Sequence, residues 1–277
     1  MNIPRERRLF LMNSLRSGTL NRYLPPIAAF VLFVGLWQLV VGQAGIPAYL
    51  LPKPSDIAEA VAANWRSLLG SVYTTTLETI LGFLFSVVGG VLGAILLASS
   101  KMIERSIYPY AIVLQTIPIV AVAPIIVIWF DAGLRSIVII AFLIGFCPML
   151  SNTLIGLNST DQNLKNLFHL YNASKWQTMW KLRIPAALPY IVGGLKISCS
   201  LCVIGAIVGE YVAGVGGGQG GLGYAITYAA MRIQTPYLFA CGLMASLLGI
   251  AFYQLVSYLS RKLLGSWHES ELRTDID

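Results

Sequence analysis

The sequence has little charge. Only 11% of its 277 residues are charged, whereas 56% are hydrophobic and the mean hydropathy is +0.72. Soluble globular domains contain about 25% charged residues. This composition excludes an ordinary soluble protein. It indicates a polytopic membrane protein that has several spans and no large soluble domain.

Histidine and cysteine are also scarce. The chain has 2 histidines, His169 and His268, too few to suggest a metal cluster. Its 4 cysteines all lie inside apolar runs, which favours small packing residues over redox or metal chemistry. These cysteines are Cys147, Cys199, Cys202 and Cys241. No metal site is therefore expected.

Nucleotide-binding and catalytic motifs are missing as well. There is no G-x-x-x-x-G-K-[ST], so the chain does not bind ATP through a P-loop. G-x-S-x-G and H-E-x-x-H are also absent. The stretch Gly216–Gly221 matches G-x-G-x-x-G by letters, but no strand precedes it, so a flexible loop is the better interpretation. The chain is expected to be neither an enzyme nor the holder of a cofactor.

What the chain does contain is a series of apolar runs long enough to cross a bilayer. They predict an all-α membrane bundle of six transmembrane helices, formed by a single domain over residues 1–277. Small residues in the second run, Gly82, Gly89, Gly90 and Gly93, predict close helix packing. The expected spans are Tyr23–Val41, Ser71–Ser99, Pro109–Phe130, Ile137–Leu157, Tyr190–Ala213 and Leu238–Leu259.

Prolines and polar residues predict how these spans are interrupted and joined. Pro118 and Pro124 predict a kinked or broken third span. In the segment 43–70, Ser55 is the expected cap of a short surface helix that presents Ile57, Val61, Trp65 and Leu68 on one side. We expect Pro185 and Pro189 to stop the helix pattern before the fifth span.

The basic residues predict the orientation of the chain. The first 22 residues, the turn around Lys101, the stretch 161–189 and the tail hold most of the 19 Lys and Arg. The other connections hold only Lys53, Arg66, Arg135 and Arg232. The positive-inside rule therefore places both termini and residues 161–189 in the cytoplasm, and segments 43–70 and 214–237 outside. Because the basic residues are spread over several loops and are not gathered on one face, they do not indicate nucleic-acid binding.

The stretch Asp161–Pro189 is the longest polar interruption, and its pattern predicts two short amphipathic helices. Asp161 and Ser174 are the expected N-caps. Asn172 is expected to end the first helix in a left-handed conformation. Apolar stripes follow each cap, with Tyr171 on the first helix and Trp176 and Trp180 on the second. On spacing alone, this stretch is either a docking surface or an ordinary loop with interfacial helices.

Two carboxylates fall within spans, where charge is costly and often functional. Glu78 lies about two turns into the second span, and its pattern favours neither a pathway role nor a structural one. Glu210 lies near the end of the fifth span, where anchoring of the following loop is the favoured interpretation.

The stretch Asp161–Pro189 resembles the EAA coupling loop of binding-protein-dependent ABC importer permeases, in the branch for nitrate, sulfonate, taurine, riboflavin and pyrimidine-type substrates. Asn172-Ala173-Ser174 stands where the family has Gly-Ala-Ser, and Ile184-Pro185 where it has Leu-Pro. The EAA triplet falls on Asn166-Leu167-Phe168, so its acidic residue is missing.

Other segments resemble this branch in the same order along the chain. Leu51-Pro52-Lys53-Pro54 resembles its external Leu-Pro-x-Pro, and Pro118-x-x-Ala121-x-x-Pro124 resembles its third span. Gly209-Glu210 and Gly221-Leu222-Gly223-Tyr224 resemble the segment after its fifth span. Glu78 stands where the family often has a basic residue, so no role carries over to it.

The resemblance implies a type I importer permease in the cell inner membrane, paired with a second permease copy in a homodimer. Separate ATPase subunits would bind ATP and Mg²⁺, and a periplasmic or extracellular binding protein would deliver the solute. The implied ATPase-coupling residues are Asn166, Leu167, Phe168, Tyr171, Asn172, Ala173, Ser174, Trp176, Trp180, Ile184 and Pro185. The candidates for the pathway are Glu78, Pro118, Pro124, Ser198 and Glu210.

The expected substrate is a small organic solute, such as a sulfonate, taurine, or a pyrimidine or riboflavin-type compound. A nitrate or bicarbonate-type anion importer is the alternative within the family. A stand-alone secondary transporter or channel is the alternative from another class, with Glu78 and Glu210 as its ion site.

Overall fold

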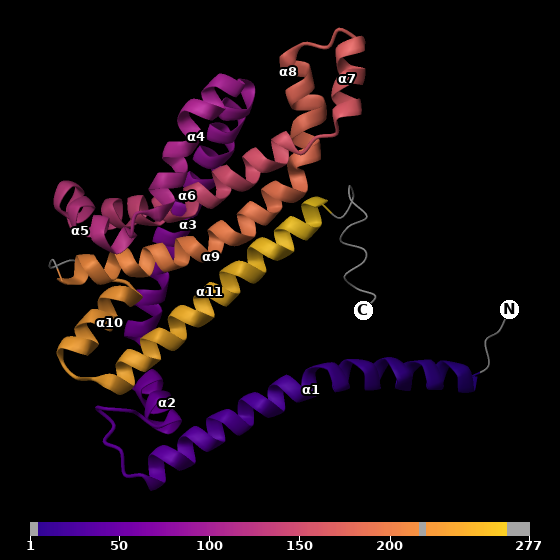
Figure 1. Ribbon diagram of the computed structural model, residues 1–277. Helices are drawn as coiled ribbons and strands as arrows, with labels where there is room; N and C mark the ends of the chain where they lie inside the picture. Colours follow the sequence, from indigo (N-terminus) through magenta and orange to yellow (C-terminus); the bar gives the residue numbers. More distant parts are fainter. Residues whose placement is uncertain (1–4, 216–219, 265–277) are drawn as a thin grey trace.

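The computed structural model describes residues 5–215 and 220–264, and the side chains of residues 24–214 and 220–262. Every regular element in these ranges is helical (Figure 1). The elements are α1 (Arg5–Gln43), α2 (Pro54–Ala63), α3 (Trp65–Ser99), α4 (Lys101–Thr116), α5 (Ile119–Phe130), α6 (Leu134–Asn158), α7 (Gln162–Leu170), α8 (Lys175–Thr178), the π-helical turn η1 (Met179–Arg183), α9 (Ile184–Val215), α10 (Leu222–Met231) and α11 (Thr235–Leu264).

The helices supply the predicted number of spans. Within the described residues, five helical segments are long and apolar enough to cross a membrane: Leu24–Gln43, Trp65–Ser99, Leu134–Asn158, Lys175–Gly214 and Thr235–Lys262. The pair α4 and α5 passes the same test only together and is bent by 96°. Counted as one span, this pair makes six. The all-α, multi-span prediction is thus confirmed.

The centre of the bundle is formed by α3, α6 and α9, which lie side by side in Figure 1. Glycines allow their backbones to approach. A Cβ on Gly82 would lie 2.5 Å from that of Ala141, and one on Gly205 would lie 2.8 Å from the Cα of Ala141. A Cβ on Gly90 would lie 2.8 Å from that of Met149. The close packing predicted for the second span is therefore present, since small residues are what permit such contacts between membrane helices.

The two ends of the bundle differ. In Figure 1, α7 and α8 project at one end, here called the loop end, whereas α2 and α10 lie at the opposite end, here called the α10 end. The helix α1 runs apart from the central helices and meets the rest near α2. There Trp37 packs on Phe239 at a ring-centroid distance of 6.1 Å, and the Gln38 amide donates to Ser55 Oγ.

Several details of the sequence prediction are wrong. The cap of α2 is Lys53 and not Ser55, and a break at Asn64 assigns Trp65 and Leu68 to α3. Lys101, expected in a loop, opens α4. The third span breaks at Pro118, as predicted, but Pro124 lies within α5.

The prolines at the start of the fifth span do not stop the helix either. Pro185 and Pro189 both lie inside α9, which continues directly from η1. The π-turn η1 ends two residues before Pro185, so this proline falls where the regular hydrogen-bond pattern is already interrupted. The helix α10 was not anticipated, because its residues follow a glycine-rich stretch that was read as part of a loop.

Candidate functional site

The local structure of the α7–α8 hairpin follows from its capping residues. Asp161 accepts a 2.6 Å hydrogen bond from the Asn163 backbone N–H and caps α7. Asn172 has φ +54°, the left-handed conformation predicted to end that helix. Ser174 and Gln177 form a reciprocal capping box at the start of α8, with bonds of 2.8 and 3.2 Å. All three predicted turning points are confirmed.

The hairpin exposes large apolar side chains that a solvated loop would not need. Tyr171 is 80% exposed and Trp176 is 67% exposed. The rings of Trp176 and Trp180 meet edge to face at 5.5 Å, which holds both indoles in place. Leu170, next to Tyr171 in the chain and 77% exposed, was missed as a site residue. We call this surface the docking face: Leu170, Tyr171, Trp176 and Trp180.

The other predicted coupling residues divide between a hollow in the hairpin and the bundle. Leu167, Phe168 and Ala173 line a hollow of about 350 Å³ together with Tyr171, Gln177 and Lys181. Asn166 accepts a hydrogen bond from Gln162 on the α7 surface. Ile184 instead packs against the buried cluster at the loop end, and Pro185, half-buried, follows it in α9.

A residue that the sequence did not single out, Arg183, ties the hairpin to the bundle. Its guanidinium donates to the Leu157 carbonyl at 2.9 Å, to the Ala98 carbonyl at 2.8 Å and to Asn158 Oδ1 at 3.0 Å. The acceptors belong to the ends of α3 and α6. A basic residue directly before Ile184-Pro185, at the first turns of a span, was the signal that could have found it.

Further polar side chains complete this arrangement. Asn158 donates to Glu104, which forms a 2.9 Å salt bridge with Lys101, and the Lys165 ammonium lies 3.5 Å from the Asn158 carbonyl. The resulting network joins α3, α4, α6, α7 and η1. We call it the clasp: Lys101, Glu104, Asn158, Lys165 and Arg183.

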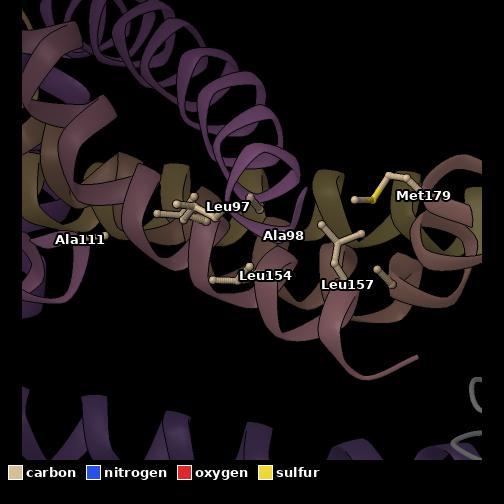
Figure 2. Packing of buried hydrophobic residues seen from close by; sticks show 9 residues of the cluster. Leu97, Ala98, Ala111, Leu154, Leu157 and Met179 are labelled. Atoms are coloured by element: carbon tan, nitrogen blue, oxygen red, sulfur yellow. The ribbon is translucent and has the colours of Figure 1, made fainter. Parts of the chain in front are cut away.

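A layer of buried apolar side chains lies next to the clasp. Figure 2 shows Met179, at the start of η1, beside Ala98 and Leu157 at the ends of α3 and α6. All three side chains are buried, as are Leu97 and Leu154 further along the bundle. The hairpin is therefore joined to the bundle by hydrogen bonds and by apolar packing together.

The opposite end of the bundle contains a buried carboxyl cluster: Glu78 and Glu210, with Thr75 and the start of α10. Glu210 is 1% exposed and accepts a 2.6 Å bond from the Thr75 hydroxyl and a 2.7 Å bond from the Gly223 N–H. The Leu222 N–H donates to Thr75 Oγ1 at 2.9 Å. Glu210 therefore fixes the N-terminus of α10, in keeping with the anchoring interpretation.

Glu78 adds a second acid to this cluster. It is 3% exposed, its side chain contacts that of Glu210, and its Oε2 has no hydrogen-bond partner. No basic side chain pairs with either carboxyl in the described part of the chain. Two adjacent carboxylates repel each other, so burying this pair costs free energy.

The remaining pathway candidates lie elsewhere. Pro118 is at the bend between α4 and α5, and Pro124 is exposed on α5. Ser198 is fully buried and donates to the Gly145 carbonyl at 2.8 Å, so in this conformation it joins α9 to α6. The structure does not bring these three residues together with Glu78 and Glu210.

Comparison with known proteins shows which family shares this sequence and architecture. Residues 86–265 match the family model described as the binding-protein-dependent transport system inner membrane component. The chain is 31% identical over 88% of its length to a probable ABC transporter permease protein of Haemophilus influenzae, of which 98% is covered. It is 34% identical over 90% of its length to the formylaminopyrimidine transport permease protein ThiX of Halalkalibacterium halodurans, of which 97% is covered.

Other similar proteins include the riboflavin transport system permease protein RibX of Chloroflexus aurantiacus, at 34% identity over 88% of this chain and 90% of the relative. Among solved structures, a chain from an amino acid ABC transporter crystallised with histidines shares the fold, with a TM-score of 0.58 at 16% identity. The match covers 73% of this chain and 96% of that one. The chain thus belongs to the inner-membrane permease family of binding-protein-dependent ABC transport systems, as a multi-pass transport subunit.

Proposed function

We propose that this chain lines the translocation pathway of an ATP-driven importer and that the α7–α8 hairpin couples it to separate ATPase subunits in the cytoplasm. Both termini would lie on that side, and a binding protein would deliver the solute at the α10 end. Two copies of the chain would form the complete pathway, and ATP and Mg²⁺ would bind only to the ATPase partners. The observation that carries this proposal is the docking face, joined to the spans through Arg183.

The chemistry of the docking face suits a helix-in-groove contact. Exposed aromatic side chains on a short helix are typical anchors for a hydrophobic groove in a partner. Tyr171 and Trp176 project from the hairpin, and the neighbouring hollow offers a place for a partner side chain. Because Asn166 stands where the family has an acidic residue, these contacts would depend on apolar burial more than on an ion pair.

The substrate we propose is a small organic solute, and within that class a pyrimidine or flavin-like heterocycle. Relatives with 34% identity carry formylaminopyrimidine and riboflavin transport in their names, whereas nitrate import permeases match at 23–28%. Transport assays with the cognate binding protein loaded with a pyrimidine, riboflavin, a sulfonate or nitrate would decide among them. Uptake of nitrate alone would overturn this assignment.

The docking proposal is tested by charge at the hairpin. Trp176→Asp and Ala173→Asp should each abolish co-purification of the ATPase and reduce transport to background, because a buried unpaired carboxylate disrupts an apolar contact. Tyr49→Asp, at an exposed position at the α10 end, is the matched control and should leave co-purification unchanged. If both hairpin variants retain the ATPase and transport, the hairpin is not the docking site.

The pathway proposal has its own test. Cysteines placed at Pro118, Pro124 and Ser198 should react with an external thiol reagent to different extents with and without ATP. Ser198 is buried between helices in this conformation, so its labelling would require the spans to separate. Equal inaccessibility in both states would remove these positions from the pathway.

A further inference from the structure

A second, larger hollow lies at the loop end, between the hairpin and the end of α3. Its volume is about 410 Å³. Ile95 and Ser99 form the α3 side, and Lys165, His169, Lys175 and Arg183 contribute to the remainder of its lining. No acidic side chain lines this hollow among the described residues. The hollow shares Ala173 and Trp176 with the docking proposal, and Lys165 and Arg183 with the clasp.

The electrostatics of the hollow favour an anion. Partial burial and the repulsion of Arg183 and Lys101 lower the pKa of the Lys165 ammonium below its ordinary value, and only Asp161 acts in the other direction. The guanidinium of Arg183 is already committed to carbonyl and amide acceptors in the clasp. Lys165 and Lys175 therefore line a space whose positive charge a phosphate would offset.

The surroundings of the hollow favour a lipid as the source of that phosphate. Along α3, the apolar side chains Phe85, Val88, Leu92 and Leu96 share one face at spacings of three and four, and each is more than half exposed. This ridge ends beside Ser99, at the mouth of the hollow.

We propose that this hollow binds the headgroup phosphate of an anionic phospholipid from the leaflet at the loop end, with an acyl chain lying along the α3 ridge. Lys165 and Lys175 hold the phosphate, and the exposed leucines contact the chain. Basic pockets beside membrane helices recognise anionic lipids in this way. The lipid would then brace the hairpin against α3, at the level of the clasp. This goes beyond the proposed docking of an ATPase and does not depend on it.

The test uses the purified full-length chain, without any ATPase, stripped of lipid in a neutral detergent. Phosphatidylglycerol should raise the Tm by several degrees and be retained in native mass spectra, whereas phosphatidylcholine and inorganic phosphate should do neither. The double variant Lys165→Gln, Lys175→Gln should weaken phosphatidylglycerol binding by about tenfold or more. Lys53→Gln with Arg66→Gln, at the α10 end, should bind as the wild type does.

The outcomes separate the possible sources of the anion. Equal stabilisation by inorganic phosphate would show a free-anion site and overturn the lipid assignment, as would equal effects of the two lipids. Unchanged binding in the double variant would overturn the site. Should that variant fail to fold, Lys175→Gln alone, at an exposed position, must still weaken binding. Because no ATPase is present, failure here leaves the co-purification result at Trp176 unaffected.

Discussion

At the loop end, the guanidinium of Arg183 donates to three oxygen atoms on α3 and α6, whereas at the α10 end two carboxyl groups, Glu78 and Glu210, lie buried side by side. The first arrangement joins a projecting hairpin to the spans. The second fixes a short helix, α10, against α3 and α9. The loop end also exposes aromatic side chains, while Glu210 is 1% exposed.

The difference matches the two tasks that the proposed function gives to the two ends. An arginine can satisfy several backbone acceptors at once, so it suits the joint that would transmit force in that function. A buried carboxyl that accepts from a hydroxyl and a backbone N–H is held in one position, so it suits a fixed anchor. We therefore expect substitutions at the two ends to change the free energy of unfolding through different interactions and by different amounts.

Replacing the arginine should have the largest effect on stability. Arg183→Met keeps the apolar stem but leaves the carbonyls of Ala98 and Leu157 and the Asn158 amide without their donor. We expect a loss of about 2–4 kcal/mol in the free energy of unfolding, since bonds to a charged donor contribute the most. Thermal unfolding in detergent measures it. Lys181→Met, exposed in the same turn, should cost less than about 0.5 kcal/mol.

Substitutions of the two acids in the carboxyl cluster should change the free energy of unfolding by different amounts. Glu210 accepts from two donors, so Glu210→Gln would turn an amide NH₂ toward one of them and cost about 1–3 kcal/mol. Glu78→Gln should be close to neutral, because it removes one of two adjacent buried acids whose Oε2 has no hydrogen-bond partner. The same unfolding measurement applies to both. A larger loss in Glu78→Gln than in Glu210→Gln would contradict the anchoring role of Glu210.

The hairpin turn should show the smallest effect. Asn172 has φ +54°, a conformation that costs other L-residues about 1–2 kcal/mol. Asn172→Ala should therefore destabilise the turn by about 1 kcal/mol, and Asn172→Gly should be neutral or slightly stabilising. Hydrogen exchange of the α7 amides reports this locally. Equal protection in the two variants would show that the turn does not depend on the left-handed residue.

Local signals predicted the hairpin well because its geometry is set by residues close in sequence. Asp161, Asn172 and Ser174 each act on backbone groups within three residues. The spans could be predicted equally well, because their length and apolarity can be read from the sequence itself. The same local reasoning failed at Pro185 and Pro189, because both lie in a helix, α9, that continues from the packed turn η1 and does not start after the prolines.

The two polar clusters could not be predicted, because they join residues far apart in sequence. Arg183 is bonded to a carbonyl 85 positions away, and Glu210 to a hydroxyl 135 positions away. The sequence pointed to Glu210 through its cost in a membrane and named it with Glu78 only as the ion site of the alternative transporter. Nothing in the sequence linked Glu210 to Thr75. The helix α10 was missed for a related reason: its N-terminus is held by Glu210, which lies 13 positions earlier in the chain.

The most direct test of the account is the coupling ratio, solute transported per ATP hydrolysed, of the reconstituted transporter carrying Arg183→Lys. Lysine keeps the charge but does not reproduce the planar fork that reaches α3 and α6 together. The account predicts wild-type co-purification of the ATPase, because the docking face is intact, with a coupling ratio reduced about tenfold. An unchanged ratio, or loss of the ATPase from the complex, would contradict the role of Arg183 as the joint between the docking face and the spans.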